Sequence, residues 1–141
     1  MNYRCAHRWS FTQWGGALDE KTDELAAPAG HEVTVRVTHC GMCHSDLHIQ
    51  IGGFDMGGGK LSSLERSGTK LPVTMGHEIG GEVVEIGPDV TSVKVGDKVV
   101  VYPWIGCGEC PTCQAGNDHV CPRAMRNLGL NAEYVQPVSL Q

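Results

Sequence analysis

The chain of 141 residues has the length of one domain and is short for an enzyme that also builds a cofactor-binding domain. Its formal net charge of −5 argues against a protein that binds nucleic acid or anionic membranes. No apolar run approaches the ~18 residues of a transmembrane helix, and residues 1–10 lack the features of a secretory signal. We therefore expect a cytoplasmic protein with no nucleic-acid or membrane partner.

Short predicted strands, separated by glycine and proline, occupy most of the chain. Over residues 32–39, three valines alternate with polar residues, which is the period of two of a half-buried strand. The same reasoning predicts further strands at residues 79–86, 98–102 and 132–138. Only residues 45–50 indicate a helix, and it is brief. Regularly spaced strands of this kind predict a mainly β fold, either a barrel or a sandwich.

Two segments interrupt the strand pattern. Residues 52–69 are rich in glycine and serine and predict a surface loop, with a short helical turn at 61–66. Residues 104–122 hold a cluster of cysteines and too few apolar side chains for a core of their own. We expect a metal ion to replace that core, within a single domain that spans residues 1–141.

The cysteine cluster has the spacing C-x2-C-x2-C-x7-C, formed by Cys107, Cys110, Cys113 and Cys121. Four thiolates so close in sequence suit a tetrahedral zinc ion, and a site closed by four cysteines is structural rather than catalytic. An iron–sulfur cluster and a rubredoxin-like iron site are the alternatives among metals. Two disulfides are a further alternative, but disulfide geometry disfavours bonds between cysteines so close in sequence.

A second group of candidate ligands surrounds Cys43. The run Cys43-His44-Ser45-Asp46-Leu47-His48 is followed 34 residues after Cys43 by His77-Glu78. Taken singly, a cysteine is usually a small buried apolar residue, and a histidine is usually an ordinary polar one. Together these residues offer the thiolate, imidazole and carboxylate ligands of a catalytic zinc. Cys40 and Cys43 also form a C-x-x-C pair, for which a redox role is the alternative.

Three motifs resemble those of the zinc-dependent medium-chain alcohol dehydrogenases. The first is Gly76-His77-Glu78-x2-Gly81-x5-Gly87-x2-Val90, the second is Gly41-Met42-Cys43-His44-Ser45-Asp46-Leu47-His48, and the third is the four-cysteine cluster. They occur in the order of that family and extend the resemblance over residues 32–138. The resemblance implies a GroES-like β-barrel, which is the catalytic domain of these enzymes, with a small zinc-binding lobe at residues 104–122.

The resemblance also implies how the second group binds metal. Cys43 and His77 match two ligands of the catalytic zinc, and Glu78 matches an acid near the metal that serves as an alternate ligand. Asp46 matches the carboxylate that orients the imidazole of His77, as partners of metal-bound histidines commonly do.

The remaining matches concern the reaction. Ser45 matches the hydroxyl that takes the substrate proton, His48 the end of the relay to solvent, and His44 a residue that contacts the cofactor pyrophosphate. The implied activity is oxidation of a small alcohol to an aldehyde or ketone, or the reverse, with hydride transfer between substrate and NAD(P). Zinc supplies the Lewis acid for such a reaction.

The sequence departs from the family where the cofactor would bind. The family's second half is a Rossmann domain, and no G-x-G-x-x-G stands between a strand and a helix here. The family's third catalytic zinc ligand also has no counterpart. We expect a catalytic domain that binds zinc, has weak activity or none alone, and self-associates through its exposed interdomain face. The alternatives are a minimal zinc enzyme that works without a dinucleotide domain, and a non-enzymatic barrel module stabilised by zinc.

Overall fold

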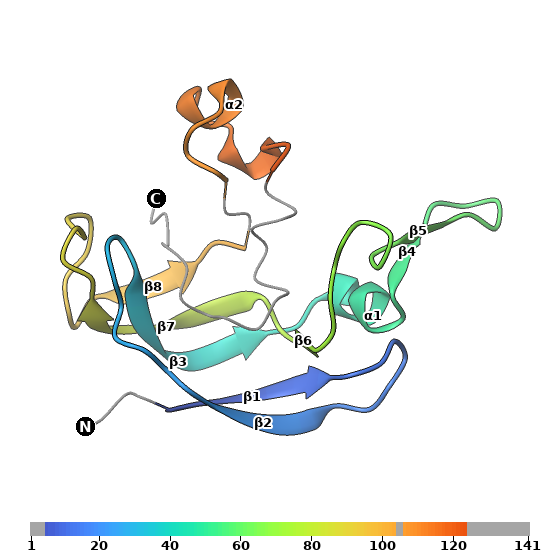
Figure 1. The fold of residues 1–141 in the computed structure, drawn as a ribbon, viewed down its shortest axis with the longest axis horizontal. Coiled ribbons are helices and arrows are strands. Elements are labelled where there is room, and N and C mark those ends of the chain that lie inside the picture. Colours follow the sequence, from blue (N-terminus) through green and yellow to red (C-terminus); the bar gives the residue numbers. More distant parts are fainter. Residues whose placement is uncertain (1–4, 104–105, 124–141) are drawn as a thin grey trace.

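The computed structural model describes residues 5–103 and 106–123 of the chain (Figure 1). Three antiparallel sheets form the framework of this part. The first contains β2 (Asp19–Glu24), β1 (Cys5–Phe11) and β6 (Val73–Thr74), in that order. The second contains β3 (Val33–Gly41), β7 (Glu78–Ile86) and β8 (Lys98–Val101). The third is a hairpin of β4 (Gly53–Asp55) and β5 (Leu61–Ser63).

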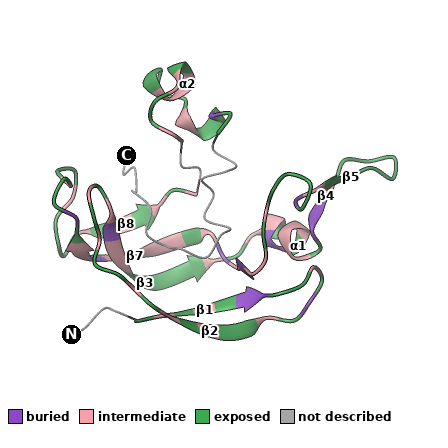
Figure 2. Cartoon of the chain, in the orientation of Figure 1, coloured by how far each residue is buried: buried purple, intermediate pink, exposed green. Residues whose placement is uncertain are grey.

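Strands β3 and β7 form the longest pairing, and a glycine lets their backbones approach closely. A side chain at Gly81 would overlap the backbone carbonyl of Arg36 in the facing strand, so only glycine fits there. Val33 on β3 and Val83 on β7 are buried, as are Phe11 and Val73 of the first sheet (Figure 2). Alternation along β7 therefore directs one face of this sheet to the core.

Three helical segments lie outside the sheets. Helix α1 (His44–Gln50) follows β3 directly and lies between that strand and the β4–β5 hairpin (Figure 1). Helix α2 (Pro111–Gln114) and the 3-10 helix η1 (Asp118–Val120) belong to a lobe that projects away from the sheets. Among the residues that the structure describes, no helix is long and apolar enough to span a membrane.

The structure confirms the mainly β prediction and most of the predicted elements. The strands expected at 32–39, 79–86 and 98–102 are β3, β7 and β8, and the helix expected at 45–50 is α1. The helical turn expected at 61–66 is wrong in its first half, because residues 61–63 pair with β4 as a strand. The strand expected at 132–138 lies outside the described residues.

The N-terminal hairpin of β1 and β2 and the short β6 are elements that the sequence did not predict. Arg8 on β1 links all three strands of this sheet. Its guanidinium donates to Asp23 on β2 and, at 3.0 Å, to Thr74 Oγ1 on β6. The hydroxyls of Ser10 and Thr74 are also 3.0 Å apart. Side-chain polar contacts therefore complement the backbone ladder of a sheet whose second strand is almost entirely polar.

Candidate functional site

Cys43 is positioned by the start of helix α1. It is the N-cap residue, and its own backbone N–H donates to Asp46 Oδ2 at 2.8 Å. In return, the Cys43 sulfur accepts a hydrogen bond from the backbone N–H of Ser45 at 3.4 Å. This reciprocal capping box satisfies backbone donors that the first turn of a helix leaves free. It also fixes the direction in which the Cys43 sulfur points.

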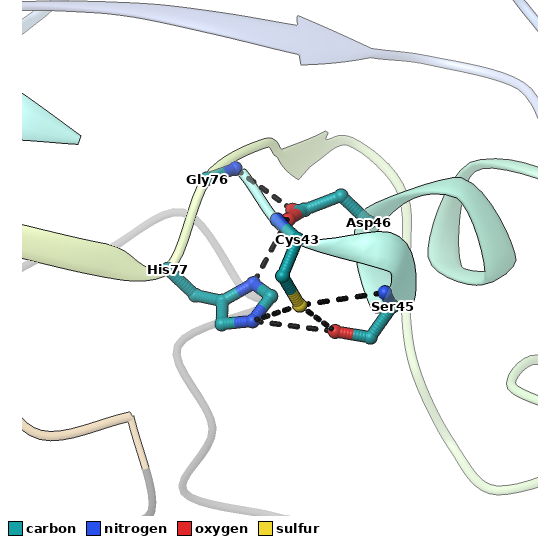
Figure 3. Close-up of polar contacts among 5 residues, drawn as sticks. All are labelled: Cys43, Ser45, Asp46, Gly76 and His77. Carbon is teal, nitrogen blue, oxygen red and sulfur yellow. Dashed lines mark hydrogen bonds and ion pairs between the residues drawn. The ribbon is translucent and has the colours of Figure 1, made fainter. Parts of the chain in front are cut away.

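His77 lies in the short link between β6 and β7, and Asp46 holds it in place. Asp46 is 2% exposed, and its Oδ1 accepts the backbone N–H of Gly76 at 3.0 Å. The same oxygen is 3.3 Å from His77 Nδ1 (Figure 3). A ring proton on Nδ1 suits the facing carboxylate and would leave the lone pair of Nε2 free to bind a metal. His77 Nε2 points to the Cys43 sulfur at 3.3 Å.

Gly76 allows this close approach. Its φ of 85° lies in the left-handed region, and a Cβ built on it would be 2.5 Å from the Cys40 sulfur. A larger residue at this position would strain the backbone and displace the link that contains His77. The glycine that precedes the histidine is therefore a geometric requirement of the site.

The pair formed by Cys43 and His77 fits a zinc ion. A tetrahedral zinc with bonds of ~2.3 Å to sulfur and ~2.05 Å to nitrogen separates the two ligand atoms by ~3.6 Å. The observed separation of 3.3 Å between Cys43 Sγ and His77 Nε2 is close to that value. Ser45 Oγ is 2.8 Å from the same sulfur and 3.3 Å from the same nitrogen. A hydroxyl therefore borders the position where a metal and its substrate would meet.

The structure brings three residues together as a group able to hold a metal: Cys43, Asp46 and His77. Asp46 is already occupied by two backbone donors and the His77 ring, which favours an orienting role over direct ligation. Glu78 stands outside this group, exposed at the start of β7, with its side chain folded against Gly41. Its role as a ligand stays a prediction.

Of the other two predicted residues of helix α1, His44 is exposed and His48 is half-buried. The rings of His44 and His48 are neighbours, with their centroids 4.8 Å apart and their planes tilted by 39°. The His48 ring also lies beside that of Phe54 on β4, with centroids 5.1 Å apart and a tilt of 36°. Phe54 was not predicted to belong to the site. No local signal marks it, because the contact depends on how the β4–β5 hairpin folds back on α1.

The four cysteines of the lobe converge on one point. Cys110 Sγ is 3.5 Å from Cys113 Sγ and 3.8 Å from Cys121 Sγ. Cys107 Sγ is 3.8 Å from Cys113 Sγ. A tetrahedral ion with bonds of ~2.3 Å to sulfur separates its ligands by ~3.8 Å, so the four thiols fit such an ion. The four cysteines are unpaired in this structure, and these sulfur separations are well beyond the ~2.05 Å of a disulfide bond.

Backbone hydrogen bonds prepare these sulfurs for metal. The N–H groups of Cys110 and Cys113 donate to the sulfurs three residues earlier, at 3.4 and 3.5 Å, and Arg123 N–H donates to Cys121 Sγ at 3.3 Å. Burial would raise the pKa of Cys107, but hydrogen bonds led by that from the backbone of Glu109 lower it to about 6. Cys107 is therefore largely thiolate at neutral pH, which is the form that binds metal, whereas burial, aided by the neighbouring sulfurs, raises the pKa of Cys113 to about 12.

Comparison with known proteins finds relatives over most of the chain. Residues 29–138 match the alcohol dehydrogenase GroES-like domain. An NAD-dependent alcohol dehydrogenase of Saccharolobus solfataricus is 44% identical over 113 residues, which are 77% of this chain and 31% of that protein. An L-threonine 3-dehydrogenase of Caldanaerobacter subterraneus is 41% identical over 110 residues, 74% of this chain and 29% of that protein.

Solved structures agree with the sequence relatives. The alcohol dehydrogenase zinc-binding domain protein of Burkholderia ambifaria superposes with a TM-score of 0.72 at 29% identity, covering 89% of this chain and 30% of its own. The chain thus spans about a third of the length of the relatives that it matches. Because the family match covers 110 of the 141 residues, from 29 to 138, the chain belongs to the family of alcohol dehydrogenase GroES-like domains.

Proposed function

We propose that this chain is the catalytic-domain portion of a zinc-dependent alcohol dehydrogenase. The observation that carries the proposal is the arrangement of Cys43 Sγ and His77 Nε2, 3.3 Å apart and held by the buried carboxylate of Asp46. The full reaction would exchange a hydride between a small alcohol or aldehyde and NAD(P). Family membership and the names of the relatives support this choice of chemistry.

In this proposal each residue near the metal has a distinct task. Cys43 and His77 would hold a zinc ion, which would supply a Lewis acid for the substrate oxygen. Ser45 Oγ, which lies beside both ligand atoms, receives the proton of the alcohol. His48 lies one helical turn after Ser45 and passes that proton to solvent through a bridging hydroxyl or water.

Two further roles belong to the same proposal. Glu78 completes the zinc coordination as a third protein ligand, which requires its exposed side chain to move away from Gly41. His44, exposed at the start of α1, contacts the pyrophosphate of the dinucleotide. The four-cysteine lobe at residues 104–122 holds a second, structural zinc within one domain of residues 1–141.

The test is the zinc content of the chain after gel filtration in metal-free buffer. We expect about two zinc ions per chain, since both ligand sets fit a tetrahedral ion. Cys43→Ser and His77→Ala should each lower the content to about one, and the exposed Cys5→Ser should leave it unchanged. A content of about one in the unmodified chain would contradict the proposed catalytic site, since the lobe alone accounts for that ion.

An activity measurement separates this proposal from a minimal zinc enzyme. We expect little or no NADH oxidation with an aldehyde substrate, because the described residues form no dinucleotide-binding fold. Turnover at rates typical of full-length enzymes, abolished by Cys43→Ser, would instead support a minimal zinc enzyme. Glu78→Gln would test the third ligand. We expect this variant to lose the zinc of the Cys43 site and to keep the zinc of the four-cysteine lobe.

A further inference from the structure

Helix α1 presents a pair of histidines that the two zinc clusters do not include. His44 and His48 are four residues apart, so they lie on the same face of the helix, one turn from each other. Their ring centroids are 4.8 Å apart. Neither ring has a hydrogen-bond partner within the described part of the chain, and His44 is exposed to solvent. Both imidazoles therefore have nitrogens available to an external ligand.

We propose that His44 and His48 form a surface chelate for a divalent transition metal of the zinc, nickel and copper class. Imidazole nitrogen is a preferred ligand for these ions. Two histidines separated by four positions on a helix are a known way to bind zinc, since one face presents both rings. Here that spacing occurs as His-Ser-Asp-Leu-His, without the glutamate of the metalloprotease motif.

The geometry allows both rings to reach one ion. Metal–nitrogen bonds of ~2.1 Å put the two ligand nitrogens ~3.4 Å apart around a tetrahedral ion and ~3 Å apart around an octahedral one. Rings whose centroids are 4.8 Å apart, with an angle of 39° between their planes, meet that requirement after a modest rotation of each side chain. The ring of Phe54 lies 5.1 Å from that of His48, tilted by 36°, and borders one side of the site.

This site is separate from the Cys43 centre although His44 is adjacent in sequence. The Cys43 sulfur turns toward His77, and the group formed by Cys43, Asp46 and His77 does not include either helix histidine. A metal across His44 and His48 would also occupy the rings assigned above to the cofactor and the proton relay. That competitive effect rests on the proposed function, whereas the metal binding itself does not.

The experiment is a calorimetric titration of the zinc-loaded full chain with Ni²⁺. Nickel is preferred to copper because it does not oxidise exposed thiols such as Cys5 and Cys40. We expect one Ni²⁺ site that His44→Gln and His48→Gln each weaken about tenfold or more, because one imidazole alone loses the advantage of chelation. The matched control, His31→Gln with His119→Gln, removes two histidines that are not neighbours on a helix and should leave the affinity unchanged.

A second measurement does not depend on the folding of any variant. In NMR spectra of the unmodified chain, paramagnetic Ni²⁺ should broaden the imidazole signals of His44 and His48 at lower concentration than those of the other histidines. Equal broadening of all histidines would overturn the proposal. So would unchanged Ni²⁺ affinity in either single variant, provided that its zinc content and circular dichroism match the unmodified chain.

Discussion

At the scale of single residues, Asp46 connects three parts of the proposed catalytic metal site. It caps helix α1 through the N–H of Cys43, holds the N–H of Gly76 and faces the ring of His77. We predict that Asp46→Asn lowers zinc affinity at the Cys43 site by ~10–100-fold, the usual cost of losing the partner of a metal-bound histidine. It should also lower the free energy of unfolding by ~1–3 kcal/mol, because a buried donor loses its acceptor.

A zinc-competition titration measures this effect for the two sites separately. The zinc of the lobe should remain bound in Asp46→Asn, since no residue of the lobe contacts Asp46 among the interactions of the described chain. Asp19→Asn, at an exposed position on β2, is the matched control and should change neither affinity. Equal zinc affinities in Asp46→Asn and the unmodified chain would show that the carboxylate does not orient His77.

A second prediction at this scale concerns Gly76. It separates two costs of a larger residue there, namely steric overlap with Cys40 and strain of the left-handed backbone. Gly76→Ala places a methyl group against the Cys40 sulfur at a φ of 85°, whereas Gly68→Ala has a φ of 93° and open space around it. Both should lose ~1–2 kcal/mol of unfolding free energy from the left-handed backbone. Gly76→Ala alone should lose further unfolding free energy from the steric overlap. It should also lose the zinc of the Cys43 site.

Urea unfolding of the zinc-loaded chain measures the difference between the two alanine variants. Adding Cys40→Ala to Gly76→Ala removes the overlapping sulfur, because the Cys40 Cβ lies 3.8 Å from the built methyl group. This double variant should regain the unfolding free energy that the steric overlap costs. It should not regain the part that the left-handed backbone costs. If it were as unstable as Gly76→Ala alone, the overlap with Cys40 would not be the cause.

At the scale of elements, we expect the lobe to depend on a bound metal more than the sheets do. Helix α2 has four residues and η1 has three, which is too short for either to be stable alone. Among the described lobe residues only Cys121 is a buried apolar side chain. We predict that Cys110→Ser, or a strong chelator, abolishes protection of the lobe amides in hydrogen exchange while β3 and β7 stay protected.

The matched control for the lobe is a cysteine outside both clusters. Cys5→Ser on β1 should leave amide protection unchanged in the lobe, because Cys5 is exposed and belongs to neither ligand group. Loss of protection in β7 on removal of the lobe metal would contradict the prediction. It would mean that the sheet β3–β7–β8 and the lobe unfold as one cooperative unit.

The elements that the sequence predicted are those with a strong local pattern. Alternating valines marked β3, and a β-rich run marked β7, although only Val33 among the alternating valines of β3 is buried. Strand β2 reads Asp-Glu-Lys-Thr-Asp-Glu, which has no apolar alternation, so its place in a sheet follows only from pairing with β1. Likewise, Cys43 and His77 were recognisable as ligand types, but the contact between Asp46 and the Gly76 backbone depends on the folded arrangement.

At the scale of the whole molecule, the described part of the chain has a small core and a large apolar exterior. Six hydrophobic side chains are buried there, whereas twelve large hydrophobic residues are exposed. Leu47 and Ile51 are 55% and 57% exposed and lie four residues apart, so they share one side at the end of α1. Each square ångström of such surface removed from water contributes ~25 cal/mol to association.

We therefore predict that the zinc-loaded chain self-associates through the side of α1 that bears Leu47 and Ile51. Sedimentation velocity should show a weight-average mass that rises with concentration, and Leu47→Glu should shift that rise to about tenfold higher concentration. Met56→Glu, in the turn after β4, changes a residue that is 70% exposed and serves as the matched control. Because both variants add the same charge, general repulsion would affect them equally, and only a specific contact at α1 separates them. A mass that stays monomeric at all concentrations, or an equal shift in the two variants, would contradict an interface at this helix.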